Sequence, residues 1–433
     1  MSFLQAVTLS LALTAASAAT SATNAPKFST IEPSLPEIQK AAATAASTTF
    51  DGSNYVKGEV FDRFYNIWLE NTDFDKAAGQ DGLKKLAKQG IVLTNYWALT
   101  HPSEPNYLAS AGGDYFGLGD DEFIRVPANV SNVADLLDTK GISWAEYQEH
   151  APYSGYQGFN FSNQQTYAND YVRKHNPLVL YDNVVNNDTR LARLQNYTEF
   201  HKAVDNKALP QWAFITPNMT NDGHDSTIEV AGNWAYNFLS PLLQNQYFTE
   251  KTLVVLTFDE NETYEIPNRI WAVLLGDIPE ELKGTTDDTY YDHYSLLSTV
   301  EANWGLPNLG RGDCGANVFQ VVANKTGYAN KKVDMSGKYN NQSVPGYFSD
   351  KSIPIPAPDL TCKGASGKGV LQAVIDTWGK SAGVTTRNNS SSNGSSNASS
   401  TAVPSQTNEQ TNSALRASTA IGAVLIGAVA ALL

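Results

Sequence analysis

Short runs of apolar residues alternate with amphipathic segments along the central part of the chain. Runs that are apolar on both faces are typical of strands buried in a parallel sheet, whereas apolar positions three or four apart indicate helices that cover such a sheet. The segment Asp81–Gln89, for example, places Leu83, Leu86 and Ala87 on one face. The predicted strands are Arg63–Leu69, Ile91–Leu99, Ile142–Tyr147, Gln211–Thr216, Thr252–Phe258 and Ile270–Leu275, and the other predicted helices are Val133–Leu137 and Tyr294–Trp304.

This alternation predicts an α/β fold, a three-layer sandwich in which helices cover both faces of a mostly parallel central sheet. No linker, low-complexity stretch or internal repeat interrupts residues 53–380, so one domain covering residues 20–383 is the simplest interpretation. Of the 433 residues, 42% are hydrophobic and 17% are charged, which is enough apolar material for one large core.

Both ends of the chain carry targeting features. Residues 1–19 combine an apolar run with small residues at its end, which predicts a secretory signal peptide, although no Lys or Arg precedes the run; a buried N-terminal helix is the alternative. Residues 384–412 are rich in Ser, Asn and Thr and predict a glycosylated stalk. Residues 413–433 end in an apolar run that fits a GPI-anchor signal removed on maturation, with Asn412 as the attachment residue. We therefore expect a cell-surface protein held to the plasma membrane by a GPI lipid, with a tail-anchored helix as the alternative.

The sequons and cysteines agree with export. The two cysteines, Cys314 and Cys362, are predicted to form a disulfide in an exported chain, with two free thiols as the alternative, and so small a number excludes a zinc site built from thiolates. Twelve Asn-x-Ser/Thr sequons predict N-glycosylation, at Asn129, Asn160, Asn187, Asn196, Asn218, Asn261, Asn324, Asn341, Asn388, Asn389, Asn393 and Asn397.

The charge balance removes one class of partner. Lys and Arg number 30 against 44 Asp and Glu, which gives a net charge of −14 at pH 7. Without a basic stripe or an Arg/Lys cluster, nucleic acid is not expected as a partner. The sequence does not indicate an oligomeric state.

Acidic and amide side chains directly follow two of the predicted strands. Glu70 and Asn71 come after the first strand, and Asp259 and Glu260 come after the fifth. Because open α/β sheets bind ligands outside the carboxyl ends of their strands, we expect these side chains to share one site, and their oxygens suit a hard divalent cation. A helix cap at Glu70-Asn71 and a polar turn at Asp259-Glu260 are the alternatives. The sequence thus predicts a divalent metal site without identifying the metal.

A proline-rich stretch after the second predicted strand holds a candidate nucleophile. Ser103 stands between Pro102 and Pro105 and two residues after His101. Each proline disfavours a helical conformation at the residue before it, so we expect a stiff, extended loop that fixes where the hydroxyl points. An ordinary proline-rich turn is the alternative.

Two His-Asp neighbours complete the polar set. His224 and Asp225 lie in a loop after the fourth predicted strand, and Asp292 and His293 open a predicted helix. A solvated loop histidine and a helix-capping histidine are the alternatives. The remaining histidines, His150, His175 and His201, have no partner pattern and are predicted to lie at the surface.

Five motifs over about residues 60 to 320 resemble, in their order, the phosphoesterase family that contains acid phosphatases and bacterial phospholipases C, and above all its fungal phosphate-repressible acid phosphatases. The motifs are Glu70-Asn71, His101-Pro102-Ser103-x-Pro105-Asn106-Tyr107, Asn218-x-x-Asn221-Asp222-x-His224-Asp225, Asp259-Glu260 and Asp292-His293-Tyr294-Ser295. The resemblance implies an alkaline-phosphatase-like fold.

The resemblance also implies roles for individual residues. It makes Ser103 the nucleophile and places His224 and His293 near the phosphate. The chain lacks the Cys that often follows the His-Asp pair in this family. The residue that donates a proton to the leaving group is therefore the least secure of these assignments. The implied metal ligands are Glu70, Asn71, Asp259 and Glu260, and the implied further phosphate contacts are Asn106, Asn221, Asp225 and Asp292.

Together these expectations describe an acid phosphatase that hydrolyses small organic phosphate monoesters through a phosphoserine. A phospholipase C-type phosphodiesterase is the nearest alternative. A non-catalytic cell-wall glycoprotein is the alternative from another class, although such a protein would not need the full set of acidic residues.

Overall fold

The computed structural model describes residues 29–379. The predicted signal peptide, stalk and GPI signal, with Asn388, Asn389, Asn393, Asn397 and Asn412, lie outside the described residues.

The strands are β1 (Arg63–Leu69), β2 (Ile91–Trp97), β3 (Trp144–Gln148), β4 (Asn160–Ser162), β5 (Asn169–Val172), β6 (Leu194–Asn196), β7 (Trp212–Thr216), β8 (Thr252–Phe258), β9 (Arg269–Gly276), β10 (Thr285–Asp287) and β11 (Tyr291–Asp292). The helices are α1 (Leu35–Ala42), α2 (Phe74–Gly79), α3 (Asp81–Ala87), α4 (Ser103–Gly112), α5 (Val133–Asp138), α6 (Asp182–Val185), α7 (Asp188–Leu191), α8 (Tyr197–Asp205), α9 (Ile228–Leu243), α10 (Gln246–Thr249), α11 (Tyr294–Trp304), α12 (Gln320–Thr326) and α13 (Gln372–Trp378), with 3-10 turns η1 (Arg173–His175), η2 (Leu178–Leu180) and η3 (Glu280–Leu282).

A nine-stranded sheet forms the centre, in the order β10-β2-β9-β8-β1-β7-β3-β6, with β11 paired to β2. All its pairs are parallel except those of β9, which is antiparallel to both β2 and β8. Every residue of β1 and of β8 is buried, as their mostly apolar sequences predict, and the polar residues Arg63 and Asn66 of β1 are buried with them. The parallel strands β1, β2, β3, β7 and β8 therefore all end at one edge of the sheet.

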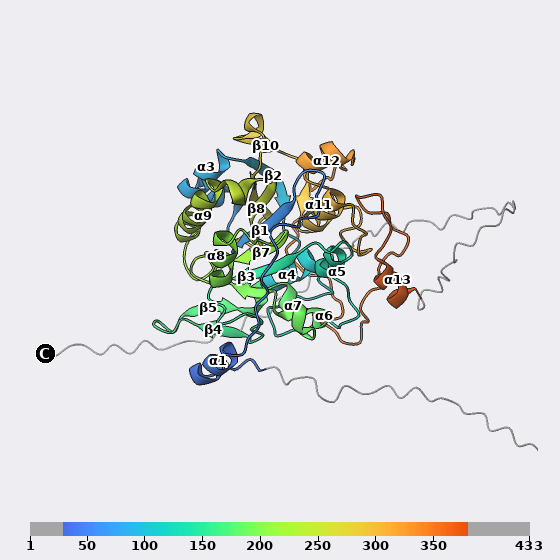
Figure 1. The fold of residues 1–433 in the computed structure, drawn as a ribbon. Helices are drawn as coiled ribbons and strands as arrows, with labels where there is room; N and C mark the ends of the chain where they lie inside the picture. The colour runs from blue at the N-terminus through green and yellow to red at the C-terminus, as the bar shows by residue number, and fades with distance from the viewer. Residues whose placement is uncertain (1–28, 380–433) are drawn as a thin grey trace, which may run out of the picture. The chain divides into compact units, whose positions relative to one another are not determined.

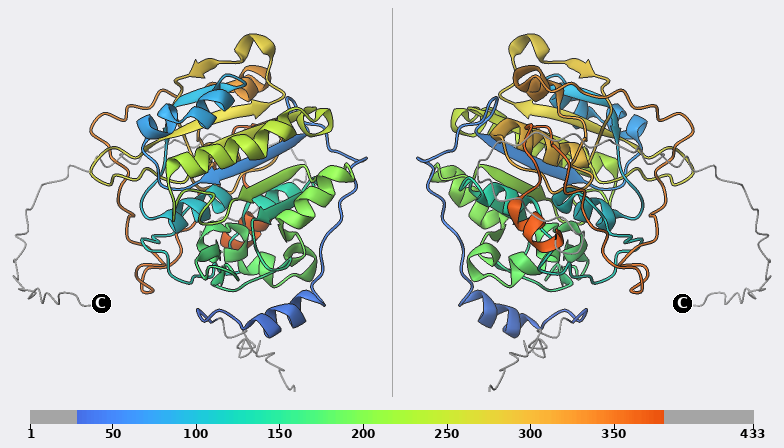
Figure 2. Two further views of the ribbon diagram at one scale, coloured as in Figure 1. Left: turned by 90° about the vertical axis from the view of Figure 1, so that its left-hand side faces the viewer. Right: turned by 90° about the vertical axis from the view of Figure 1, so that its right-hand side faces the viewer.

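Helices cover both faces of the sheet. Helices α3, α8 and α9 lie on one side, and α4, α5 and α11 lie on the other (Figure 1). Figure 2 shows the long α9, in yellow-green, crossing one face, and the red α13 on the opposite side. This confirms the predicted three-layer α/β sandwich with a mostly parallel sheet.

Several predicted elements have the bounds that the sequence suggested. Strands β1 and β8 and helix α11 match residue for residue. Sequence reasoning did not identify the β4–β5 hairpin or the short strands β6 and β10. These pieces are only three or four residues long, too short to show a period.

The expected extended loop around Ser103 is wrong, because α4 begins at Ser103 itself. Pro102 precedes the helix with an extended backbone, and Pro105 lies in its first turn. The first N–H groups of a helix have no intrahelical partner, so a proline there removes no hydrogen bond. The stretch still holds Ser103 in a fixed place, but it does so as a helix start.

Cys314 and Cys362 form the predicted disulfide, with their Cα atoms 6.3 Å apart. It joins the segment after α11 to the segment before α13. Within residues 29–379, no helix is both long and apolar enough to cross a membrane.

The sequons differ in their exposure. Asn129, Asn187 and Asn324 are exposed, and Asn160, Asn196 and Asn341 are half-buried. Asn261 is fully buried and its amide nitrogen donates to the Thr263 carbonyl at 2.8 Å, and Asn218 is 6% exposed. Both side chains are buried in the folded domain, and glycosylation at these two positions stays a prediction.

Candidate active site

Backbone hydrogen bonds bring three strand ends together. The amide of Glu70, after β1, donates to the carbonyl of Asp222, in the loop after β7, at 2.9 Å. The amide of Asp259, after β8, donates to the last residue of β1, Leu69, at 3.1 Å. The Asn71 amide donates to Asp259 Oδ1 at 3.2 Å. The order β8-β1-β7 therefore places three carboxyl groups from distant segments at one point of the sheet edge.

Ser103 faces this point from the first turn of α4. Its hydroxyl is buried and donates to Glu70 Oε2 at 3.0 Å. Tyr107, one turn later, donates its phenol to Glu70 Oε1, so one carboxylate anchors both hydroxyls. The free N–H groups and the dipole at a helix start favour an anion, so the surroundings of Ser103 suit a phosphate.

Glu70, His175 and Asp222 form a cluster that could hold a metal ion. One donor atom of each lies within 4.8 Å of the others. His175 Nε2 is 3.4 Å from Glu70 Oε1, and its Nδ1 is 3.4 Å from Asp222 Oδ2. His175 is 1% exposed, so the prediction that it lies at the surface is wrong. Its ring stacks on Tyr107 in the interior, 5.1 Å between centroids.

The chemistry of these donors fits a divalent cation. Buried atoms without a hydrogen-bond partner include Asn71 Oδ1, Asp222 Oδ2 and Asp259 Oδ2. Burial raises the pKa of Asp259 to about 6, and burial together with the charges of Asp259 and Asp222 raises the pKa of Glu70 well above its usual value. So many unneutralised oxygens in one buried place are costly unless a cation lies among them. Asn71, at φ +25°, shows that the backbone is held in a left-handed conformation at this point.

Glu260, the fourth predicted ligand, contacts a different partner. Its Oε2 lies 2.6 Å from His101 Nδ1, and both side chains are 1% exposed. Burial lowers the pKa of His101 to about 4 and raises that of Glu260, which favours a neutral pair that shares one proton. Tyr264 stacks on the His101 ring at 3.7 Å between centroids. Glu260 thus lies beside Asp259 but is not part of the His175 cluster.

His224 lies at the mouth of the site. Its Nδ1 is 2.7 Å from Asp225 Oδ1, its side chain is 27% exposed, and its Nε2 is 3.3 Å from Lys174 Nζ. Although burial opposes it, the carboxylates of Asp121 and Glu70 raise the pKa of Lys174, which keeps that ammonium charged. A hollow of about 370 Å³ opens here, lined by Asn71, Thr72, Lys76, Gly223, His224, Ser226, Thr227, Ile228 and Glu262.

His293 and Asp292 are more deeply buried than His224. His293 is fully buried, its Nε2 is 2.6 Å from the Asp259 carbonyl, and its Nδ1 is 3.4 Å from the Tyr96 hydroxyl. Burial lowers the pKa of His293 to about 3, so the ring is neutral and both nitrogens have partners. Asp292 accepts from the Tyr290 hydroxyl and from the Tyr294 amide, both at 3.0 Å. In this arrangement His293 can position Asp259, and the Asp292 carboxylate accepts from the first backbone amide of α11.

Two residues predicted to contact the phosphate, Asn106 and Asn221, make hydrogen bonds to protein groups instead. The Asn106 amide oxygen accepts from the Leu99 amide at 3.0 Å, and its nitrogen donates to the Thr100 carbonyl at 2.9 Å. The Asn221 nitrogen donates to both Glu149 carboxylate oxygens at 3.0 Å. A phosphate contact would require either amide to give up these hydrogen bonds.

Sequence reasoning assigned no role to Asp222, His175 or Lys174. Asp222 stands inside a motif that the sequence singled out, so its neighbours could have indicated it. His175 and Lys174 belong to η1, which carries no local signal. Only the packing of η1 against α4 and Glu70 brings them to the site.

Comparison with known proteins agrees with this geometry. The sequence pattern of the phosphoesterase family matches residues 80–307. The chain belongs to the phosphoesterase family, which confirms the predicted resemblance to this family; the matched residues include four of the five motifs, and Glu70-Asn71 lies before them.

Relatives can be named individually. The chain is 62% identical over 352 residues to a Kluyveromyces lactis protein named "Probable acid phosphatase", covering 81% of this chain and 83% of that protein. It is 54% identical to an Aspergillus fumigatus acid phosphatase, covering 80% of this chain and 78% of the relative. A crystal structure of a protein in the alkaline phosphatase superfamily from Vibrio parahaemolyticus is 12% identical, covers 61% of this chain and 73% of that one, and has a TM-score of 0.37. So low a score carries no further conclusion.

Proposed function

We propose that this protein is an acid phosphatase that hydrolyses monoesters of phosphoric acid with small organic alcohols. The observation that carries this proposal is the hydrogen bond from Ser103 Oγ to Glu70 Oε2, at a helix start beside a buried cluster suited to a divalent cation. Relatives that share more than half of their aligned residues with this chain are named acid phosphatases.

The reaction runs through two in-line displacements, in which Ser103 is the nucleophile of the first and its Oγ is the leaving group of the second. Its proton passes to Glu70 Oε2, its Oγ bonds to phosphorus, and the bond from phosphorus to the alcohol oxygen breaks. Water then attacks the phosphoserine and releases orthophosphate. Glu70, His175 and Asp222, with Asn71 and Asp259 beside them, would hold the divalent cation. When bound, the cation would polarise the phosphate oxygens and favour ionisation of the serine.

His224 supplies the proton to the departing alcohol. Asp225 holds its Nδ1, which leaves Nε2 pointing toward Lys174 and the mouth of the site. In the present arrangement Nε2 accepts from the Lys174 ammonium, which can only donate, so His224 can protonate a leaving oxygen once the phosphate engages Lys174 and leaves Nε2 free to take up a proton. His293 is fully buried and lies farther from the mouth. Lys174 contributes a positive charge that attracts the phosphate dianion.

The hollow at the mouth favours a small, polar alcohol over a lipid. Of its lining residues, Ile228 is the one with a large aliphatic side chain, and the others offer hydroxyl, amide, imidazole and charged groups or, at Gly223, backbone. Lys76 and Glu262 form an ion pair of 2.6 Å at its rim. A lipid tail would desolvate these groups without replacing their hydrogen bonds.

We also propose that the protein is exported and held at the cell surface by a GPI lipid. The apolar ends of the sequence, the exposed sequons at Asn129, Asn187 and Asn324, and the disulfide support this location.

A substrate panel on one purified sample tests the proposed activity. 4-Nitrophenyl phosphate, bis(4-nitrophenyl) phosphate and phosphatidylcholine are compared at pH 5, with metal content measured on the same sample. We expect the monoester to be hydrolysed fastest, and a phosphorylated Ser103 peptide to be recovered after acid quenching. Faster hydrolysis of phosphatidylcholine would favour the phospholipase C alternative, and no hydrolysis of any ester by a metal-loaded sample would favour the non-catalytic one.

A further inference from the structure

Tyr264 presents an aromatic ring at the mouth of the candidate active site. It lies in the loop after β8, a short distance along the chain from Glu260. One face of its ring stacks on His101, with 3.7 Å between centroids and an angle of 23° between the ring planes. His101, two residues before Ser103, is 4% exposed, whereas Tyr264 is 45% exposed. Because His101 covers one face of the ring, the exposed part is the opposite face and the edge.

Charged groups from two sides of the site act on this ring. Burial raises the pKa of Tyr264 to about 12, and the charges of Glu260 and Asp259 add to that shift. Asp121 adds to it as well, whereas Lys174 opposes it. Asp121 and Lys174 pair at 2.9 Å and come from segments far from β8 in the chain. Since such interactions weaken with distance, all four groups lie near the phenol, which agrees with a position at the mouth.

Hydrogen bonds fix the loop that carries Tyr264. Asp73 accepts from the Thr263 amide and from the Thr263 hydroxyl, both at 2.9 Å. The Thr263 carbonyl accepts from the Asn261 side chain at 2.8 Å, and the Tyr264 carbonyl accepts from the Asn341 side chain at 2.7 Å. A ring that is held in place before a ligand arrives loses little freedom on binding, so more of its contact energy contributes to affinity.

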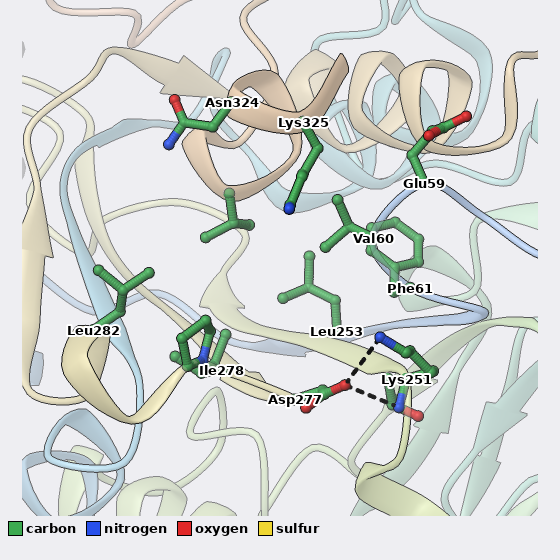
Figure 3. Close-up of a pocket in the computed structure, with 13 residues that line it drawn as sticks. Glu59, Val60, Phe61, Lys251, Leu253, Asp277, Ile278, Leu282, Asn324 and Lys325 are labelled. Atoms are coloured by element: carbon green, nitrogen blue, oxygen red, sulfur yellow. Dashed lines mark hydrogen bonds and ion pairs between the residues drawn. The ribbon is translucent and has the colours of Figure 1, made fainter. Parts of the chain in front are cut away.

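A hollow of about 450 Å³ at the opposite edge of the sheet has a different character (Figure 3). Its wall carries two acidic and two basic side chains, those of Glu59, Asp277, Lys251 and Lys325. These charges cancel, and Phe61, the aromatic residue of the lining, is 1% exposed and presents no free ring face. The exposed ring of Tyr264, in contrast, lies beside groups that can hold the phosphate end of a ligand.

We propose that Tyr264 selects the leaving alcohol, by stacking its free ring face on a flat aromatic or heteroaromatic ring of the phosphate ester. This inference rests on the proposed phosphatase function, because a phosphate held beside Ser103 brings the organic group of the ester to the mouth. Two stacked rings attract each other beyond the gain from their buried area, whereas an aliphatic group of equal size contributes buried area alone. Among small alcohols, those with a flat ring are therefore the preferred leaving groups.

Two phosphonates that resist hydrolysis test the proposal on the intact protein. Phenylphosphonate and cyclohexylphosphonate are similar in size and charge, and only the first has a flat aromatic face. Their inhibition constants and that of orthophosphate are measured against 4-nitrophenyl phosphate at pH 5, and calorimetric titration gives the three affinities without turnover. The variants are Tyr264→Leu, which keeps an apolar side chain, Tyr264→Phe, which keeps the ring, and Tyr236→Leu, which removes a half-buried ring from α9.

We expect the wild-type protein to bind phenylphosphonate about three- to tenfold more tightly than cyclohexylphosphonate, the range that corresponds to one aromatic pair. Tyr264→Leu should remove this preference, while Tyr264→Phe and Tyr236→Leu should keep it. Orthophosphate should bind to all four proteins alike.

Equal affinity of the wild-type protein for the two phosphonates, or a preference that survives in Tyr264→Leu, would overturn the proposal and leave the phosphatase function standing. An equal loss of affinity for all three anions in Tyr264→Leu would also overturn it, because the ring would then only support His101. If the wild-type protein hydrolysed no phosphate ester, the proposed function would be wrong, and this proposal with it.

Discussion

Two groups of buried acids in this domain differ in what surrounds them. At the active-site edge, Glu70, Asp222 and Asp259 converge with His175, and several of their oxygens have no hydrogen-bond partner. Glu301 of α11, a helix on the face of the sheet that α4 also covers, is also fully buried, but it faces Asp313.

In the second pair the backbone satisfies only one member. Asp313 accepts hydrogen bonds from the Leu309 and Arg311 amides, whereas neither carboxyl oxygen of Glu301 has a hydrogen-bond partner, and no hydroxyl or imidazole converges on it. Burial and the neighbouring Asp313 charge raise the pKa of Glu301 well above its usual value, so the pair carries at most one negative charge. Burial of an acid alone therefore does not indicate a site. Convergence of unpaired oxygens with a hydroxyl and an imidazole does.

The largest expected effect comes from removing the hydroxyl of the first group. Ser103→Ala should lower kcat by at least roughly a thousandfold, because no covalent intermediate can form, while the unfolding transition stays close to wild type. Steady-state kinetics with 4-nitrophenyl phosphate and thermal unfolding measure both.

Ser110→Ala, which removes a buried hydroxyl from the same helix, is the matched control and should retain most activity. Thr100 cannot replace Ser103 without rearrangement, because its hydroxyl bonds Ser343 at 2.9 Å. If Ser103→Ala kept more than about a tenth of wild-type turnover, the covalent mechanism would be refuted.

Neutralising one acid from each group sharpens the comparison. Asp222→Asn should weaken divalent-metal retention by roughly a hundredfold or more, since it removes a proposed ligand, and part of the lost activity should return with excess metal. Glu301→Gln should leave metal content and activity unchanged. Metal analysis after dialysis against a weak chelator reads out both, and equal metal loss in the two variants would contradict the proposed metal site.

The smallest effect is on stability and concerns acids outside the metal cluster. Burial raises the pKa of Asp292 from 3.8 to about 6 in the folded protein. A raised folded pKa means that the folded state holds the proton more tightly, so this contribution is full below about pH 4 and is lost as the pH rises through about 6. It amounts to roughly 3 kcal/mol at most. Glu301 acts in the same direction.

We therefore expect the metal-free protein to unfold at lower urea concentration at pH 7.5 than at pH 4.5. Asp292→Asn and Glu301→Gln should each reduce that difference, whereas Asp205→Asn, at an exposed position on α8, should not. A wild-type protein that is more stable at pH 7.5 would show that these carboxyl groups are ionised in the folded state.

The sequence by itself determined the main strands and the polar residues at their carboxyl ends. β1 and β8 were predictable because a strand buried on both faces is mostly apolar, and the polar residues directly after them, Glu70 and Asp259, had to lie at the carboxyl edge. Local order along the chain also placed Ser103 and His224 near that edge. These predictions needed only neighbours in sequence.

Tertiary structure decided which of these side chains meet. His175 enters the site because η1 packs beside α4, and His293 turns inward because its ring fits between Tyr96 and the Asp259 carbonyl. Asn261 heads a sequon yet is buried, because the loop after β8 folds back over it. Sequence patterns report burial and period within one element, whereas these contacts join segments far apart in the chain. Their existence depends on strand order and loop packing, which no local pattern specifies.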